Sequence, residues 1–320
     1  FRRSFGELPI TDEGITSFGE TAKGLMIIAI PITVGSAGLQ ILTMLETKLY
    51  MGQLLNLGYA QAQADTMKGI YNMTQTIFNM PCAFIVPITV SVIPAITAAL
   101  TLRENNQVRT TEESAARITG LMSLPCAVGL FLLGQPVMAL LGGYEGQLLT
   151  TGGMLMALLG LCIFPYAIIQ YTNALLQAHG YAHVPVINML ICGVAKLAVV
   201  YVLVGNPNVG LMGAPIGALV CYFCIAVLTL IAIRRLVPQK PRLVTALIRP
   251  ALAAITMGIA VWAAYKGLSM VFTKTILVCG GSIAVGVVVY FISVILFKAI
   301  TAEDCKLLPK GDKIAKILHL

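Results

Sequence analysis

Eight apolar stretches recur along the chain, and each is long enough to cross a lipid bilayer as an α-helix. A helix needs about 20 apolar residues to span the hydrocarbon core. Polar residues, glycine and proline gather between the stretches, as they do in loops. The stretches cover residues 24–46, 69–98, 115–141, 151–177, 183–204, 211–233, 246–266 and 275–298. The sequence therefore predicts an all-α, polytopic membrane protein with about eight transmembrane helices.

The charge content excludes other classes of protein. Charged residues make up 11% of the chain, against about 25% in a soluble domain, so the chain cannot cover a surface that faces water. A transmembrane β-barrel would show short segments of alternating polarity, and the sequence has none. The formal net charge of +8 belongs to no soluble basic domain, so we expect no nucleic acid partner.

The positions of lysine and arginine predict how the chain is oriented. With eight spans, both chain ends lie on one side of the membrane, and 16 of the 21 basic residues lie on that side. Four lie on the opposite side, and Lys196 lies inside a span. Cytoplasmic loops are enriched in basic residues, so we expect both ends of this chain to be cytoplasmic, in a protein of the cell membrane. Anionic lipid headgroups are the expected partners of these charges.

Lys196 lies in the middle of the apolar stretch 183–204. An ammonium at the centre of a membrane helix costs about 2.5–3.5 kcal/mol, and Lys196 is two to three turns from either end of its span. The spans offer one carboxylate, Glu46, at the predicted outer end of the first span. The expected depths do not favour an ion pair between the two. We therefore predict that Lys196 faces a water-filled cavity.

Polar side chains at helical spacing mark four of the eight spans. Within each span they fall on one helix face, because residues four or seven apart lie on the same side. The residues are Gln40 (in a stripe with Glu46 at its outer end), Tyr71 with Gln75 and Asn79, Tyr166 with Gln170, Asn173 and Gln177, and Asn188 with Lys196. One interpretation is hydrogen bonding between helices, at about 0.6 kcal/mol for each bond. Because the stripes concentrate in four spans, we favour a shared polar cavity.

Chemistry for catalysis is missing from the sequence. His179 and His183 have a metal-ligand spacing, but Gly180 interrupts the helix between them, and no catalytic or phosphate-binding motif is present. The cysteines lie mostly inside apolar spans, where cysteine behaves as a small hydrophobic residue. We therefore expect no enzyme activity, no metal and no cofactor.

Three segments carry a family resemblance: "IPITVGSAGLQILTMLETKLY", "GIYNMTQTIFNMPCAFIVPITVSVIPAITAAL" and "ARITGLMSLPCAVGLFLLGQPVMALLGG". In this order, they resemble the polysaccharide-transporter branch of the multidrug/oligosaccharidyl-lipid/polysaccharide exporter superfamily, and within it the group of stage V sporulation protein B and the lipid II flippases. "ALLQAHGYAHVP" and the lysine of "GVAKLAVVY" are similar to that group as well. The likeness covers the second half of such a protein, and the chain begins with Phe1, so we expect six further spans upstream.

The resemblance implies a domain organisation. Members of the family have two lobes of six helices around a central cavity, and flippase-type members carry an extra helix pair where a lipid tail lies. Residues 24–233 would be the second lobe, and residues 246–298 would be the extra pair. The remaining segments would be a cytoplasmic or interfacial N-terminal segment (1–23), a basic cytoplasmic linker (234–245) and a cytoplasmic tail (299–320).

The resemblance also implies a transport function. The expected substrate is a saccharide on an undecaprenyl-pyrophosphate type of lipid, for peptidoglycan or another cell-wall or spore-wall polysaccharide, moved by alternating access. Lys196 would meet the anionic headgroup, and the amide side chains would meet sugar hydroxyls. Two alternatives stay open. One is a cation-coupled multidrug exporter in which Glu46 takes the cation, and the other is a non-transporting scaffold that binds wall-synthesis proteins.

Overall fold

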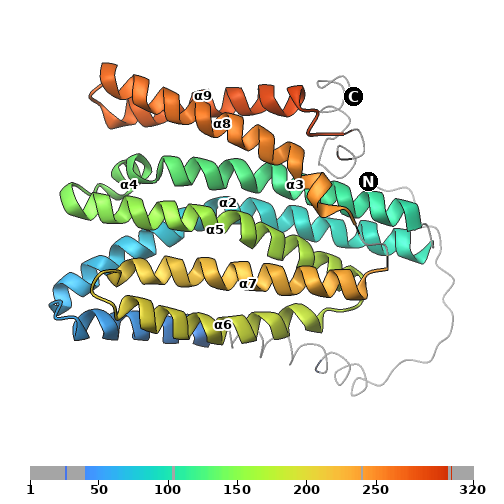
Figure 1. Ribbon diagram of the computed structural model, residues 1–320, viewed down its shortest axis with the longest axis horizontal. Helices are drawn as coiled ribbons and strands as arrows, with labels where there is room; N and C mark the ends of the chain where they lie inside the picture. The colour runs from blue at the N-terminus through green and yellow to red at the C-terminus, as the bar shows by residue number, and fades with distance from the viewer. Residues whose placement is uncertain (1–25, 27–39, 103–104, 239–240, 302–303, 305–320) are drawn as a thin grey trace, which may run out of the picture.

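The computed structural model describes residues 26, 40–102, 105–238, 241–301 and 304, and every regular element within them is helical. Seven helices are long and apolar enough to cross a membrane, so the all-α, multi-pass prediction is confirmed. A helix over 40–56 comes first (Figure 1). It is followed by α2 (Gln61–Thr101), α3 (Asn105–Leu132), α4 (Gly134–Gly142), α5 (Gly146–Ala178), α6 (His183–Val204), the 3-10 turn η1 (Gly210–Met212), α7 (Gly213–Leu236), α8 (Leu243–Val271) and α9 (Thr275–Leu296).

The first predicted span ends later than its composition suggested. The prediction placed its end at residue 46, but the helix continues to residue 56. The stretch "GQLLNLGYA" contains glycine and polar residues, which indicated a loop. Leu54 in this stretch is nevertheless fully buried, so packing against the bundle keeps the segment helical. The beginning of this span, residues 24–39 apart from 26, lies outside the described residues.

The predicted span 115–141 is two helices. α3 ends at Leu132 and α4 begins at Gly134. Pro136 explains the break, because proline has no N–H to donate to the carbonyl of Leu132 and its ring collides with that carbonyl. Each of the other six spans corresponds to one membrane-length helix, and α6 has the predicted bounds 183–204.

α5 is the central helix of the bundle, and α6 lies at its edge. In the most apolar part of α5, 67% of the residues are buried, against 17% in α6. α5 packs against α2, α3, α4 and α7. Its small residues permit this, since a Cβ added to Gly160 would lie 2.9 Å from the backbone nitrogen of Phe131 on α3. Small residues let membrane helices approach closely.

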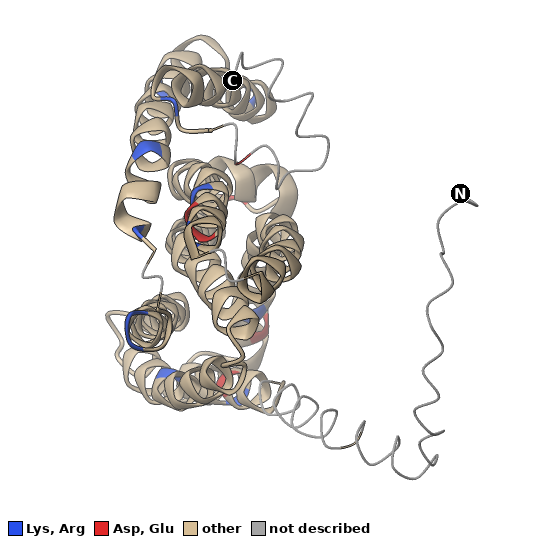
Figure 2. Cartoon of the chain, turned by 90° about the vertical axis from the view of Figure 1, so that its right-hand side faces the viewer, with Lys and Arg blue, Asp and Glu red and all other residues tan. Residues whose placement is uncertain are grey.

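The last two helices form a separate layer. α8 and α9 pack against each other, and α8 also packs along α3. This pair lies on the side of α3 away from α6 and α7 (Figure 1). Seen along the helices, most of the ribbon carries no charged residue (Figure 2). The few charges inside the bundle are therefore exceptional, and their positions locate the candidate site.

Candidate functional site

Lys196 and Glu46 form an ion pair inside the bundle. Lys196 Nζ donates to Glu46 Oε2 over 2.6 Å, and the two side chains are 18% and 7% exposed. The prediction that their depths disfavour a pair is wrong. Because the first helix continues to residue 56, Glu46 lies about 15 Å from the end of its helix. Lys196 lies eight residues before Val204, or about 12 Å from the end of α6, so both charges are at a similar depth.

Two parallel helices hold the pair. Helix 40–56 and α6 run in the same direction, since Leu42 lies beside Gly193 and Gln53 lies beside Gly205. A Cβ on Gly193 would come within 2.7 Å of Leu42 Cδ1, so the missing side chain lets the helices approach one turn from the ion pair. This register along α6 brings Glu46 opposite Lys196.

α7 also packs closely against α6. Gly213 and Gly217 on α7 are four residues apart, the spacing of a small-residue contact between membrane helices. A Cβ on Gly213 would lie 2.7 Å from the backbone nitrogen of Val204, and one on Gly217 would lie 2.5 Å from Val200 Cγ2. α6, which carries Lys196, therefore packs closely against both α7 and helix 40–56.

The pair faces the inside of the bundle. The Glu46 side chain is 7% exposed and that of Lys196 is 18% exposed, so neither charge lies on the outer surface of the bundle. The second carboxylate oxygen, Glu46 Oε1, is buried and accepts no hydrogen bond from any residue that the structure describes. Breaking a buried ion pair is costly, yet such a pair contributes little net stability compared with apolar packing. Its presence in an apolar bundle points to function rather than to stability.

An aromatic cluster occupies the space near the pair. The ring of Tyr166 meets Phe78 edge-on at 5.9 Å and Tyr222 edge-on at 5.8 Å, and Tyr71 meets Tyr50 edge-on at 5.7 Å. These tyrosines belong to or pack against the main apolar core. Of the predicted stripes, the two tyrosine members therefore lie in packed aromatic contacts.

The amide members of the stripes differ in their exposure. Gln40, Asn79 and Gln177 are exposed, and the half-buried ones are Gln75, Gln170, Asn173 and Asn188. Within the part of the chain that the structure describes, no hydrogen bond links Gln75, Asn79, Gln170, Asn173, Gln177 or Asn188 to another helix. Hydrogen bonding between helices therefore does not account for them in this structure. Their role in a cavity stays a prediction.

A second buried cluster was missed by the sequence interpretation. Glu112 on α3 is fully buried, and its Oε1 lies 2.8 Å from His179 Nε2 at the end of α5. The Tyr171 hydroxyl donates to the Glu112 carbonyl. The sequence interpretation considered His179 only as a spacing partner of His183. The acidic pair in "TTEESAAR" was the available signal, but its location near a helix start made it look like a loop.

The chain is similar in sequence to several membrane proteins. The family model for the lipid II flippase MurJ matches residues 18–283. The uncharacterized membrane protein YabM of Bacillus subtilis (strain 168) is 25% identical over 318 residues, and stage V sporulation protein B of the same strain is 22% identical over 303 residues. The alignments cover 96% and 93% of this chain, but 57% and 56% of the relatives. The chain thus spans about half the length of the curated relatives it matches.

Solved structures share the fold. The lipid II flippase MurJ in an inward closed conformation aligns with a TM-score of 0.66, over 90% of this chain and 57% of that chain, at 13% identity. A transporter of the MOP superfamily from Pyrococcus furiosus aligns with a TM-score of 0.54, over 90% of this chain and 68% of that chain, also at 13% identity. At such low identity, the likeness concerns the fold alone. The resemblance noted in the sequence is confirmed.

Proposed function

Because this chain belongs to the lipid II flippase MurJ family, we propose that it serves in the export of lipid-linked saccharide precursors. The precursors would build peptidoglycan or another cell-wall or spore-wall polysaccharide. Helix 40–56 together with α2–α7 would form one wall of an alternating-access cavity, within the predicted lobe 24–233. α8 and α9 would be the extra pair, and both ends of the chain would face the cytoplasm.

The buried Glu46–Lys196 pair is the observation that carries the proposal. An ionisable residue inside a membrane helix faces a bundle interior or a watery cavity and marks a transport path. Lys196 gives one of its three N–H groups to Glu46, so two remain for the phosphate oxygens of an anionic lipid headgroup. Amides such as Asn79 and Gln170, which make no hydrogen bond to another of the described helices, would donate to and accept from sugar hydroxyls.

The same pair disfavours a cation-coupled multidrug exporter. That mechanism needs an intramembrane carboxylate that is free to take a proton or a metal cation. Glu46 is the one carboxylate in the spans predicted from the sequence, and the Lys196 ammonium already neutralises it at 2.6 Å. A bound cation would have to displace a covalently attached positive charge. Transport of an anion is the better match to this electrostatic arrangement.

The test is export of a labelled lipid-linked precursor, with two variants and a control. Lys196→Met removes the ammonium but leaves Glu46 buried and unpaired. The double variant Glu46→Gln/Lys196→Met removes both charges and so separates folding from transport. Lys48→Met is the matched control, because Lys48 is an exposed lysine of the same helix as Glu46.

We expect folded double-variant protein with export near background, and wild-type export for Lys48→Met. Wild-type precursor export by the double variant, with loss of drug resistance, would support the multidrug exporter instead. If neither activity changes in the folded double variant, a scaffold role replaces the transport proposal.

A further inference from the structure

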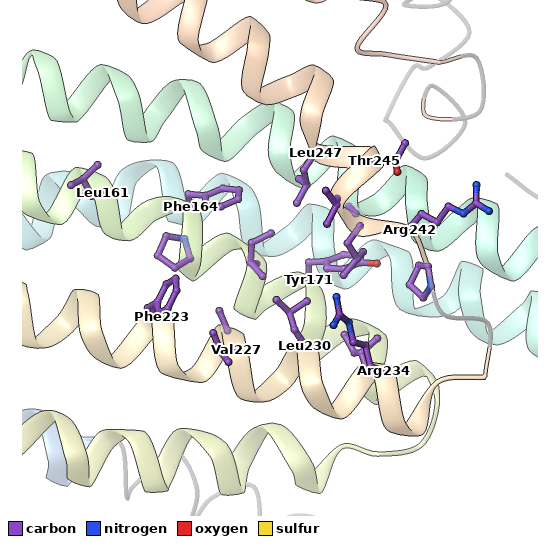
Figure 3. Close-up of a pocket in the computed structure, with 18 of the residues that line it drawn as sticks. Leu161, Phe164, Tyr171, Phe223, Val227, Leu230, Arg234, Arg242, Thr245 and Leu247 are labelled. Carbon is purple, nitrogen blue, oxygen red and sulfur yellow. The ribbon is translucent and has the colours of Figure 1, made fainter.

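An apolar cavity lies between the bundle and the last helix pair, away from the Glu46–Lys196 pair. Its volume is about 830 Å³, at the upper end of the range for small-molecule sites. α5 and α7 form most of its walls, and the beginning of α8 closes one end (Figure 3). Phe164, Phe223, Val227 and Leu230 are among the apolar side chains that line it.

The cavity suits a chain-like apolar occupant by its shape. Along α7 its lining runs from Leu219 to Arg234, 15 residues apart, which corresponds to about 22 Å of helix. One leaflet of the hydrocarbon core is about 15 Å thick, so the cavity is long enough for an acyl chain of one leaflet. An apolar cavity does not retain water, and these helices are surrounded by lipid, so acyl chains are the natural filling.

One end of the cavity is positively charged. The Arg234 side chain extends from α7 into the space beside Leu230 and Tyr171, and Arg242 lies at the same end (Figure 3). Within the described residues, Arg234 has no hydrogen bond or ion pair with another side chain. Other arginines of this end are occupied, since Arg109 pairs with Glu113 and Arg117 pairs with Asp304.

The neighbouring Arg235 shows that helix position alone does not explain Arg234. Both arginines lie in the last turn of α7, where a cation is favourable to the helix dipole. Both also contribute to the basic side of the membrane. Of these two neighbours, Arg234 lines the cavity and Arg235 does not, so only Arg234 of the pair has an adjacent apolar slot.

We propose that this cavity is a binding site for an anionic phospholipid, such as phosphatidylglycerol, of the leaflet at the basic end of the bundle. One acyl chain would lie along Phe223, Val227 and Leu230, and the phosphate would accept hydrogen bonds from the Arg234 guanidinium. A guanidinium binds phosphate oxygens in a bidentate way. The lipid would fill the space between α7 and α8 and so hold the helix pair against the bundle. This site is separate from the proposed transport path.

The experiment measures lipid retained by the protein after purification in detergent. Native mass spectrometry is combined with titration of phosphatidylglycerol and, separately, of phosphatidylcholine. Arg234→Gln removes the headgroup contact, with Arg235→Gln as its matched control. Val227→Trp fills the slot, with Leu228→Trp as its control, because Leu228 is an exposed residue of α7 outside the cavity. Helix content and elution volume verify that each variant is folded.

We expect the wild-type protein and both controls to retain phosphatidylglycerol in preference to phosphatidylcholine. Arg234→Gln should weaken phosphatidylglycerol binding about tenfold, the loss of one charge-assisted contact. Val227→Trp should abolish the binding of both lipids at this site.

Three results would overturn the proposal. The first is equal retention by Arg234→Gln and Arg235→Gln. The second is equal binding of the two phospholipids to the wild-type protein. The third is displacement of phosphatidylglycerol by stoichiometric undecaprenyl phosphate, which would assign the cavity to the tail of a transported lipid. None of these readouts depends on transport, so failure of the lipid-site proposal would leave the proposed transport function untouched.

Discussion

Two buried ion pairs of this protein have opposite surroundings. Asp304, just after α9, is fully buried, and both of its oxygens accept hydrogen bonds from Arg117 of α3. The backbone N–H of Thr301 donates to the same carboxylate. Glu46 has one oxygen on Lys196 and a second, buried oxygen without a partner in the described residues.

The difference distinguishes a pair with a structural role from the pair on which the transport proposal rests. A fully satisfied buried carboxylate rigidifies the contact it makes, whereas a partly satisfied one keeps an acceptor in reserve at a cost in stability. The Arg117–Asp304 pair fastens the end of the helix pair to α3. The Glu46–Lys196 pair leaves one buried carboxylate oxygen without a hydrogen bond from the described residues, at the place where the proposed transport path needs a polar group. Four substitutions, given from the largest expected effect to the smallest, test this difference between the two pairs.

Lys196→Met should have the largest effect of the variants. It leaves a carboxylate that is 7% exposed without its counter-charge, and breaking a buried pair in this way costs about 3–5 kcal/mol. Thermal unfolding in detergent measures the loss. The double variant Glu46→Gln/Lys196→Met should recover most of it, since no charge is then left unpaired. A double variant as unstable as the single one would contradict this account of the pair.

Asp304→Ala should have a smaller effect on stability and little effect on transport. The Arg117 side chain is 17% exposed, so its guanidinium can turn to water, and we expect a loss of about 2–3 kcal/mol. The segment after α9 should become sensitive to protease, which peptide mapping detects. Glu145→Ala is the control, because Glu145 is an exposed residue. Loss of precursor export in a folded Asp304→Ala protein would erase the distinction between the two pairs.

Gly213→Ala tests the close contact between α7 and α6, the helix that carries Lys196. The added Cβ would lie 2.7 Å from the backbone nitrogen of Val204, and overpacking of this kind costs about 1–3 kcal/mol. Gly69→Ala is the matched control on α2, where a Cβ meets nothing within 4 Å. It should stabilise the helix by up to about 1 kcal/mol. Opposite signs in thermal unfolding are expected, and equal shifts would show that close packing of α6 on α7 is unimportant.

Arg109→Gln should have the smallest effect. Its ion pair with Glu113 joins residues four apart on α3, and the two side chains are 38% and 24% exposed. Such exposed pairs contribute about 0.2–1 kcal/mol and weaken with added salt. Thermal unfolding at low and high salt should show a small difference that vanishes in the salt. A loss comparable to that of Asp304→Ala would mean that exposure does not rank these pairs.

The features of the fold that could be predicted were those that depend on the residues of one segment alone. The bounds of α6 were predicted as they are found, because apolar residues fill the stretch 183–204 between polar turns. The end of the first helix was missed because glycine and glutamine in "GQLLNLGYA" are ambiguous without their neighbours. The break before α4 could have been predicted from Pro136, but the surrounding apolar residues suggested one continuous span.

By itself, the sequence determined the membrane class, the number and place of most spans, and Lys196 and Glu46 as the exceptional charges. It could do so because a bilayer demands long apolar segments and penalises every charge within them. Only the tertiary structure decided that these two residues, 150 positions apart, form a pair. Their meeting depends on two helices that run parallel in one register, and that register is set by contacts at glycines and not by any local property of either segment.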